Sequence, residues 1–124
     1  MDKQKERRRR VRHSDAPLRK HRLVSFKGGW FLGNFQPSLQ RTQRCEVGYK
    51  VHAQGDVWPA HYQKTAWEYN LLVYGHLQIG RQHFYGGDLF VVPPTRVVKP
   101  LFHSRCEVVV VKIPSIPGDK VCVS

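Results

Sequence analysis

The feature of this sequence that most restricts its fold is the series of short β-branched and aromatic runs that begins at Leu23. Glycine, proline and aspartate interrupt these runs at short intervals, as at Gly86, Gly87 and Asp88. No stretch of this region repeats apolar residues with the helical period of 3.6, so helices are not expected there. Many short strands between turn residues are typical of an all-β barrel or sandwich. Strands are expected at residues 23–26, 29–34, 45–53, 60–64, 68–74, 76–79, 81–85, 89–92, 97–101 and 106–112.

The most apolar segment is CEVVVVKI, at residues 106–113, which contains four consecutive valines. Because apolar and polar residues do not alternate there, we expect a strand that is buried on both faces. Pro114, Pro117 and Gly118 follow it and end it, since proline cannot donate a ladder hydrogen bond. The residues after the strand are expected to form an irregular strap over the barrel.

The formal net charge of +12 is concentrated near the N-terminus. Residues 1–22 contain ten Lys or Arg and three acids, whereas residues 23–124 contain eleven and six. Such a dense run of like charges repels itself and has little apolar surface to bury. We therefore predict a disordered basic tail over residues 1–22, a barrel over residues 23–118 and a C-terminal tail over residues 119–124.

The composition also argues against several classes of protein. No apolar run approaches the roughly 20 residues that a membrane-spanning helix needs. The first residues lack the apolar centre of a secretory signal, so we expect a cytoplasmic protein. Cys45, Cys106 and Cys122 are widely spaced, which predicts neither a disulfide framework nor a zinc motif.

Residues 55–75 contain a motif with a characteristic spacing. Five residues separate Gly55 from His61, four separate Gln63 from Glu68, and six separate Glu68 from Gly75. This segment resembles the first motif of the cupin family, in which the position of Gln63 is occupied by a second histidine.

A second motif follows at residues 86–98, GGDLFVVPPTRVV. Five residues separate Gly87 from Pro93, as in the second cupin motif. Thr95 occupies the place of a glycine in that motif, and Val98 occupies the place of a histidine. The resemblance covers about residues 45–112. It implies an all-β, cupin-type double-stranded β-barrel (jelly roll), and a homodimer, since many small cupins form one.

The resemblance also implies where a metal would be held. Cupin metal sites use three imidazoles and one carboxylate, which suit iron, manganese, nickel or zinc. Here His61 and Glu68 stand at ligand positions, Gln63 is a weak neutral oxygen ligand, and Val98 cannot ligate. His103 lies five residues further along and reaches the site only if the strand bends. We therefore expect no metal cofactor, with a site formed by those four possible ligands as the alternative.

Strand alternation indicates which side chains face the barrel interior. Alternate residues share a face, so His61 and Gln63 point together, as do Glu68 and Asn70. Burying each such group without a partner costs about 1–3 kcal/mol, so each needs a partner. A mutual pair of His61 and Glu68 with trapped water, left over from an ancestral metal site, would satisfy this requirement, and so would a bound ligand.

Two aromatic residues, Trp58 and Tyr62, are expected near the mouth of the barrel. An aromatic wall beside a few polar groups suits a sugar, a nucleotide base or a small carboxylate. The first functional hypothesis is therefore a binding domain for a small polar metabolite, sugar-like or nucleotide-like. Its ligand-binding residues would be Trp58, Tyr62, Gln63 and Asn70, with His61 and Glu68.

Two other functions stay open. Some cupin-like isomerases and epimerases of nucleotide sugars work without metal, and by resemblance His61 could act as their base with Glu68 orienting it. Alternatively, the protein could act through its tail, because arginines that neutralise phosphates bind nucleic acid without sequence preference. The arginines concerned are Arg7, Arg8, Arg9, Arg10 and Arg12.

Overall fold

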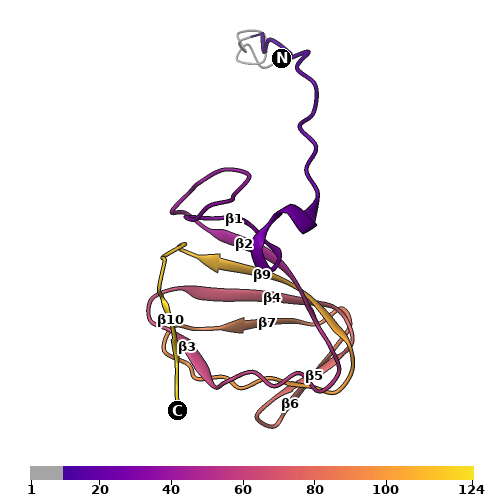
Figure 1. Ribbon diagram of the computed structural model, residues 1–124, viewed down its shortest axis with the longest axis vertical. Helices are drawn as coiled ribbons and strands as arrows, with labels where there is room; N and C mark the ends of the chain where they lie inside the picture. Colours follow the sequence, from indigo (N-terminus) through magenta and orange to yellow (C-terminus); the bar gives the residue numbers. More distant parts are fainter. Residues whose placement is uncertain (1–9) are drawn as a thin grey trace, which may run out of the picture.

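The computed structural model describes residues 10–124 of the 124-residue chain (Figure 1). The predicted all-β architecture is confirmed. Helix in the described chain is limited to two 3-10 turns, η1 (Leu23–Ser25) and η2 (Lys27–Gly29). The strands are β1 (Trp30–Leu32), β2 (Glu46–His52), β3 (His61–Gln63), β4 (Trp67–Tyr74), β5 (His76–Ile79), β6 (Gln82–Tyr85), β7 (Leu89–Val92), β8 (Leu101–Phe102), β9 (Cys106–Ile113) and β10 (Lys120–Cys122).

The strands form two walls that face each other (Figure 1). One wall is a five-stranded sheet in the order β1-β2-β9-β4-β7. The other combines the sheet β6-β5-β8 with the pair β10-β3. Isolated bridges from Val57 to Leu101 and from His61 to Val98 continue the pairing between those two parts. The result is the barrel that the two sequence motifs implied.

The valine-rich strand β9 lies in the middle of the five-stranded sheet, between β2 and β4. Its inward Cys106, Val108 and Val110 are buried, whereas the outward Val109 and Val111 are only half-buried. The prediction that both faces are buried is therefore wrong for the outer face. Tyr69 and Val91, which follow Val111 across that face, are 41% and 53% exposed.

Apolar packing is concentrated at one end of the barrel. The cluster consists of Leu72, Leu77, Phe102, Cys106, Val108 and Val110. The last glycine of the first motif, Gly75, allows the chain to turn there. Its φ is +108°, and a Cβ atom on it would lie 2.3 Å from the carbonyl oxygen of Arg105, so only glycine fits.

The last strand lies beyond residue 118, where the barrel was expected to end. β10 pairs antiparallel with β3, with Val121 opposite Tyr62. Just before β10, the buried carboxylate of Asp119 accepts hydrogen bonds from the backbone N–H groups of Thr65, at 3.0 Å, and Ala66, at 2.9 Å. These bonds anchor the C-terminal segment, so part of the predicted tail is a strand of the barrel wall.

Residues 10–22 have no regular secondary structure and extend away from the barrel (Figure 1). The strand expected at residues 23–26 is wrong, because backbone hydrogen bonds close 3-10 turns there, from Ser25 to Arg22 and from Phe26 to Leu23. β8 is also shorter and begins later than the strand expected at residues 97–101. The three cysteines are free thiols. No described helix has the length and apolar character to cross a membrane.

Candidate functional site

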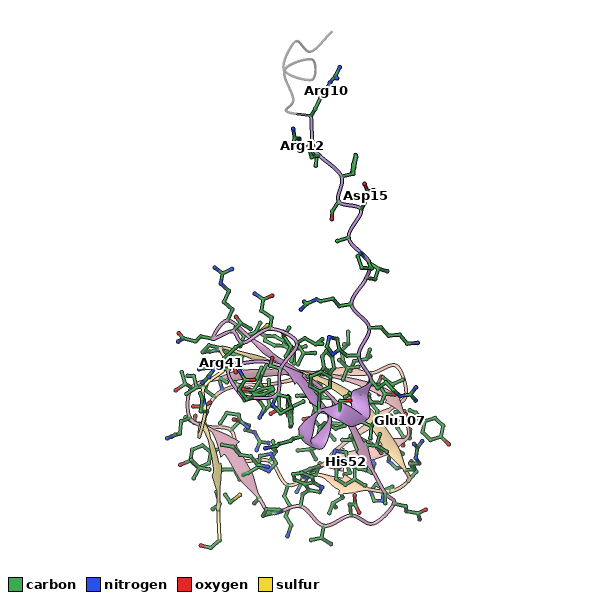
Figure 2. The ribbon with its side chains drawn as sticks, turned by 45° about the horizontal axis from the view of Figure 1, so that its top comes forward. Arg10, Arg12, Asp15, Arg41, His52 and Glu107 are labelled. Carbon is green, nitrogen blue, oxygen red and sulfur yellow. The ribbon has the colours of Figure 1, made fainter. Side chains whose placement is uncertain are left out.

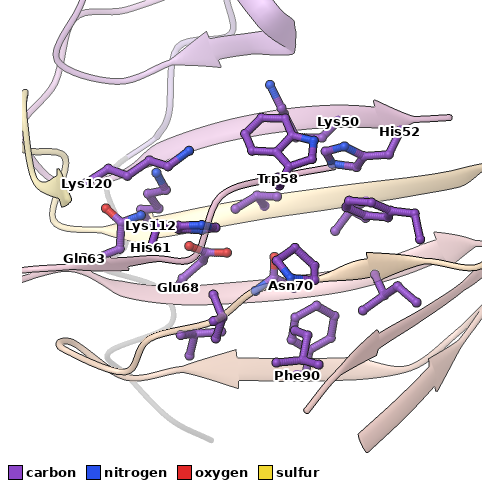
Figure 3. Close-up of a pocket in the computed structure, with 18 of the residues that line it drawn as sticks. Lys50, His52, Trp58, His61, Gln63, Glu68, Asn70, Phe90, Lys112 and Lys120 are labelled. Carbon is purple, nitrogen blue, oxygen red and sulfur yellow. The ribbon is translucent and has the colours of Figure 1, made fainter. Parts of the chain in front are cut away.

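A cavity of about 110 Å³ lies inside the barrel between its two walls (Figure 3). Leu77, Phe90 and Phe102 form part of its apolar lining. A cavity of this size holds several water molecules or one small ligand. The sequence-predicted residues that line it are Trp58, His61, Gln63, Glu68 and Asn70.

The polar groups of β4 enter the cavity because of strand alternation. Glu68 and Asn70 lie on its inner face, and the strand pairing places Lys112 of β9 opposite Glu68. Tyr69, which lies between Glu68 and Asn70 on β4, points outward and is exposed. The cavity therefore contains a carboxylate, an amide and an ammonium group on neighbouring strands.

His61 is buried on β3, and one of its ring nitrogens is held by the backbone. Its Nδ1 lies 2.9 Å from the carbonyl oxygen of Pro59. A carbonyl oxygen can only accept, so in the neutral form of the ring Nδ1 carries the proton and the lone pair is on Nε2. His61 is therefore prepared to accept a proton or a hydrogen bond. Its hydrogen-bond partner is the carbonyl of Pro59, not Glu68, which does not support the alternative of a mutual pair between His61 and Glu68.

The two predicted aromatic residues lie in different places. Trp58 lines the cavity, and the Nζ atom of Lys120 lies 4.6 Å from the centre of its ring. Tyr62 is half-buried on the opposite face of β3 from His61 and Gln63 and does not line the cavity. The structure therefore brings Trp58, but not Tyr62, to the predicted site.

Asn70 has an unmet hydrogen-bonding requirement. The residue is only 4% exposed, and its Nδ2 atom has no hydrogen-bond partner among residues 10–124. Figure 3 shows Asn70 beside Glu68 and Phe90 in the cavity. A buried donor without a partner costs about 1–3 kcal/mol, so a ligand acceptor at this place would restore a favourable interaction.

Three lysines that the sequence reasoning did not select also line the cavity: Lys50, Lys112 and Lys120. Burial lowers the pKa of Lys50, and the nearby charges of Lys120 and Lys112 lower it further. Lys112 Nζ lies 3.9 Å from a carboxylate oxygen of Glu46, which offsets part of its charge. Strand parity could have identified Lys112 and Lys50, because each lies on the inner face of its strand.

His52 is another cavity residue that the sequence analysis did not select. It is buried on the inner face of β2, stacked on Phe102 with ring centres 4.1 Å apart and in edge contact with Trp58 at 5.3 Å. Burial is the main cause that lowers its pKa, and the charge of Lys50 adds to the effect. His52 therefore contributes a neutral imidazole to the cavity wall near pH 7.

The cavity residues do not fit the four-ligand metal site of the cupin family. At the family's four ligand positions, His61 and Glu68 are the two strong donors, and the other cavity imidazole, His52, lies outside both motifs. Val98, bonded to His61 through the backbone in both directions at 3.0 and 2.8 Å, places an apolar side chain where a histidine would stand. Lys112, opposite Glu68, places a positive charge where a cation would have to bind.

His103, the fourth metal ligand considered from the sequence, does not line the cavity. Its Nε2 lies 2.7 Å from the Oε1 atom of Gln78, and its ring neighbours are His76 and His83. The structure therefore separates His103 from His61, Gln63 and Glu68.

The arginines proposed to contact nucleic acid lie in the tail. Arg7, Arg8 and Arg9 lie outside the described residues. Arg10 and Arg12 are exposed on the extended segment that leads away from the barrel (Figure 2).

No protein-family model matches the chain, and no curated protein matches it in sequence. Similarity is found among solved structures. A protein with a double-stranded β-helix domain from Klebsiella pneumoniae superposes with a TM-score of 0.57 and 13% identity, over 69% of this chain and 80% of that chain. KdgF from Halomonas sp. gives a TM-score of 0.57 and 16% identity, over 63% and 77% of the two chains.

An oxalate oxidase in complex with the substrate analogue glycolate is also similar. Its TM-score is 0.53 at 20% identity, over 64% of this chain and 46% of the oxidase. These similarities define the class of the protein by its fold, which is the cupin fold, or double-stranded β-helix.

Proposed function

We propose that the barrel binds a small polar metabolite that carries a carboxylate or a phosphate group. The observation that supports this most is the buried Nδ2 donor of Asn70, which finds no partner in the described part of the chain and lies in a cavity rich in lysine. A negatively charged oxygen is the acceptor that satisfies both the amide and the ammonium groups.

The charge of the cavity supports an anion. Of the residues that the structure describes, three lysines line it, against one carboxylate, that of Glu68. Lys50 and Lys120 take part in no ion pair among residues 10–124. Like charges in a partly buried space repel one another, so a bound anion would relieve this repulsion and gain attraction from each ammonium group.

The rest of the lining suits the carbon skeleton of such a ligand. Trp58 and Phe90 offer aromatic surface beside the polar groups. Ligand sites usually combine apolar walls with a few polar groups that fix orientation. The structural similarity to an oxalate oxidase that binds glycolate, a small carboxylate, is consistent with this class of ligand.

Calorimetric titration with matched pairs of charged and uncharged compounds tests the proposal. Sugar acids and sugar phosphates should bind, and the corresponding neutral sugars should bind at least about tenfold more weakly. Lys120→Met should weaken binding of the anions by a similar factor. Lys99→Met is the matched control, because Lys99 is exposed and does not line the cavity. Equal affinity for neutral and charged partners would contradict the proposal.

A second candidate function is proton transfer on such a ligand, as in a metal-independent isomerase or epimerase. The lone pair on Nε2 of His61 favours it. If His61 acts as a base, the protein should exchange a carbon-bound proton of a bound sugar acid with D2O, detected by proton NMR. His61→Gln should abolish this exchange. A ligand that binds without exchange would leave only the binding function.

The cupin resemblance also implied a homodimer, and we propose the outer face of the five-stranded sheet as its interface. Tyr69, Leu89 and Val91 are 41%, 75% and 53% exposed on that face. Sedimentation velocity should show a dimer that Val91→Lys dissociates, whereas Val24→Lys, at another exposed valine, should leave it intact. A wild-type monomer would contradict this interface.

The tail hypothesis and the cytoplasmic location stay predictions. Binding of single-stranded RNA to the full chain should fall steeply with salt if the tail arginines contact phosphates. Glutamine at all five arginine positions should abolish binding without changing the affinity for a sugar acid. Undiminished RNA binding by this variant would contradict the hypothesis.

A further inference from the structure

Three histidines meet on the outside of the three-stranded sheet, away from the cavity. His76 begins β5, His83 lies in β6 and His103 directly follows β8. One nitrogen from each ring lies within 4.8 Å of the other two. The ring of His76 lies 5.1 Å from that of His83 and 4.5 Å from that of His103, measured between ring centres.

The barrel itself holds these three positions together. Leu77 on β5 is paired with Phe84 on β6 and with Phe102 on β8, and all three side chains face the core. Strand alternation then directs the neighbouring residue of each strand outward. The backbone N–H of His103 also donates to the carbonyl of His76 at 3.0 Å. The cluster is thus built on paired strands.

Neighbouring groups orient the rings. Gln78 accepts a hydrogen bond from His103 Nε2 at 2.7 Å, and the amide of Gln78 donates to the carbonyl of Gly80 at 2.8 Å. This leaves the lone pair of the His103 ring on Nδ1. Tyr85 stacks on His76 with ring centres 4.5 Å apart. Such outer contacts are what orients histidine ligands in known metal sites.

We propose that His76, His83 and His103 form a surface site for a divalent transition metal, principally Zn²⁺. This site is separate from the cavity in the barrel. Three imidazoles with a fourth position open to water are a known zinc arrangement. Tetrahedral zinc with Zn–N distances of about 2.0–2.1 Å requires nitrogens roughly 3.3 Å apart. His76 Nε2 and His83 Nδ1 already lie 2.8 Å apart, and the metal would replace the proton between them.

The choice of metal follows from the ligand type. Neutral imidazole suits zinc, copper and nickel, whereas calcium and magnesium prefer oxygen ligands. Bound metal would link the β5–β6 hairpin to the residue after β8. It would therefore stabilise the native state in proportion to its affinity, because the unfolded chain does not hold the three rings together.

The test uses the full chain without an affinity tag, stripped of metal by a chelator. Zinc should bind with one equivalent per chain and micromolar affinity or better, measured by competition with a chromogenic chelator. It should raise the melting temperature by about 5 °C at saturation, whereas Mg²⁺ should not. Failure of the wild-type chain to bind one equivalent would overturn the proposal.

Variants locate the site. His83→Asn and His103→Asn should each weaken zinc binding at least about tenfold, and Gln78→Leu should weaken it through the orientation of His103. His13→Asn, in the exposed tail, is the matched control and should bind like wild type. Glu68→Gln should also leave zinc affinity unchanged. Wild-type affinity in a double His83→Asn, His103→Asn variant, or loss of binding in Glu68→Gln, would overturn the assignment.

Discussion

The two ends of the barrel interior differ although the same strands build both. Along β4 the inward residues are Glu68, Asn70 and Leu72, and along β9 the residues opposite them are Lys112, Val110 and Val108. Both strands thus change from charged to apolar in the same direction.

The apolar end contains fully buried side chains, whereas the polar end contains an amide donor without a partner and lysines that repel one another. Apolar burial stabilises the fold, and unpaired polar groups destabilise it. Burial at the apolar end therefore offsets the destabilising polar groups at the other end, which are available to bind a ligand. Substitutions at each end should therefore change stability in opposite directions.

The largest effect is expected at the apolar end. Leu72 is 0% exposed at the centre of the core cluster, so Leu72→Ala should leave a void and lower the free energy of unfolding by about 3 kcal/mol. Urea unfolding followed by tryptophan fluorescence measures this. Val57→Ala is the control, since Val57 is 87% exposed and should change stability by about 0.5 kcal/mol or less. Similar losses in both variants would contradict the comparison.

Asn70→Leu should change the free energy of unfolding in the opposite direction. It replaces a buried donor that lacks a partner with an apolar group, and the free energy of unfolding should rise by about 1.5 kcal/mol while anion binding is lost. Asn34→Leu is the control and should give no gain, because the Asn34 side chain already accepts a hydrogen bond from Arg41. A stability loss in Asn70→Leu would show that water or another group satisfies the amide in solution.

A smaller rise in the free energy of unfolding is expected from a substitution of Thr95, beside the polar end. Its φ is +69°, which is unfavourable for a β-branched residue, and its N–H donates to the carbonyl of Gln63 at 2.7 Å. Thr95→Gly should relieve the strain and raise the free energy of unfolding by about 1 kcal/mol. Thr65→Gly, at a residue without positive φ, should instead lower it by roughly 0.5–1 kcal/mol. The comparison fails if the free energy of unfolding changes in the same direction in both variants.

The smallest effect is a pH dependence at His52. Its folded pKa lies below the ordinary 6.5, so the unfolded chain takes up the proton more readily. The stability that His52 contributes is complete above pH 6.5 and is lost as the pH falls through the folded pKa. Between pH 7.5 and pH 5, the free energy of unfolding should therefore fall further in wild type than in His52→Phe. Parallel pH profiles would exclude this role.

Local patterns predicted much of the barrel. The strands expected at residues 76–79 and 89–92 coincide with β5 and β7, because turn glycines and proline bound them on both sides. Thr95 shows the same principle, since this residue stands at a glycine position of the second motif and has a φ of +69°, in the left-handed region that glycine favours. At residues 23–26 the apolar run was too short to distinguish a strand from a 3-10 turn.

The composition of the site was less predictable. Motif spacing identified His61, Gln63 and Glu68 as cavity residues, but His52 and Lys120 belong to no motif. Lys120 reaches the cavity only because β10 pairs with β3, and that pairing depends on the hydrogen bonds of Asp119 to the chain 54 and 53 residues before it.

What the residues dictate locally is therefore the sequence of strands and turns and the inward face of each strand, since alternation and turn chemistry act over a few positions. Which side chains meet is set by register and barrel closure, which act between distant segments. His76, His83 and His103 illustrate this: no local spacing unites them, yet two strand pairings place them on one surface. The lysines that share the cavity with Asn70 converge for the same reason, because closure of the barrel brings β2, β9 and β10 to one cavity.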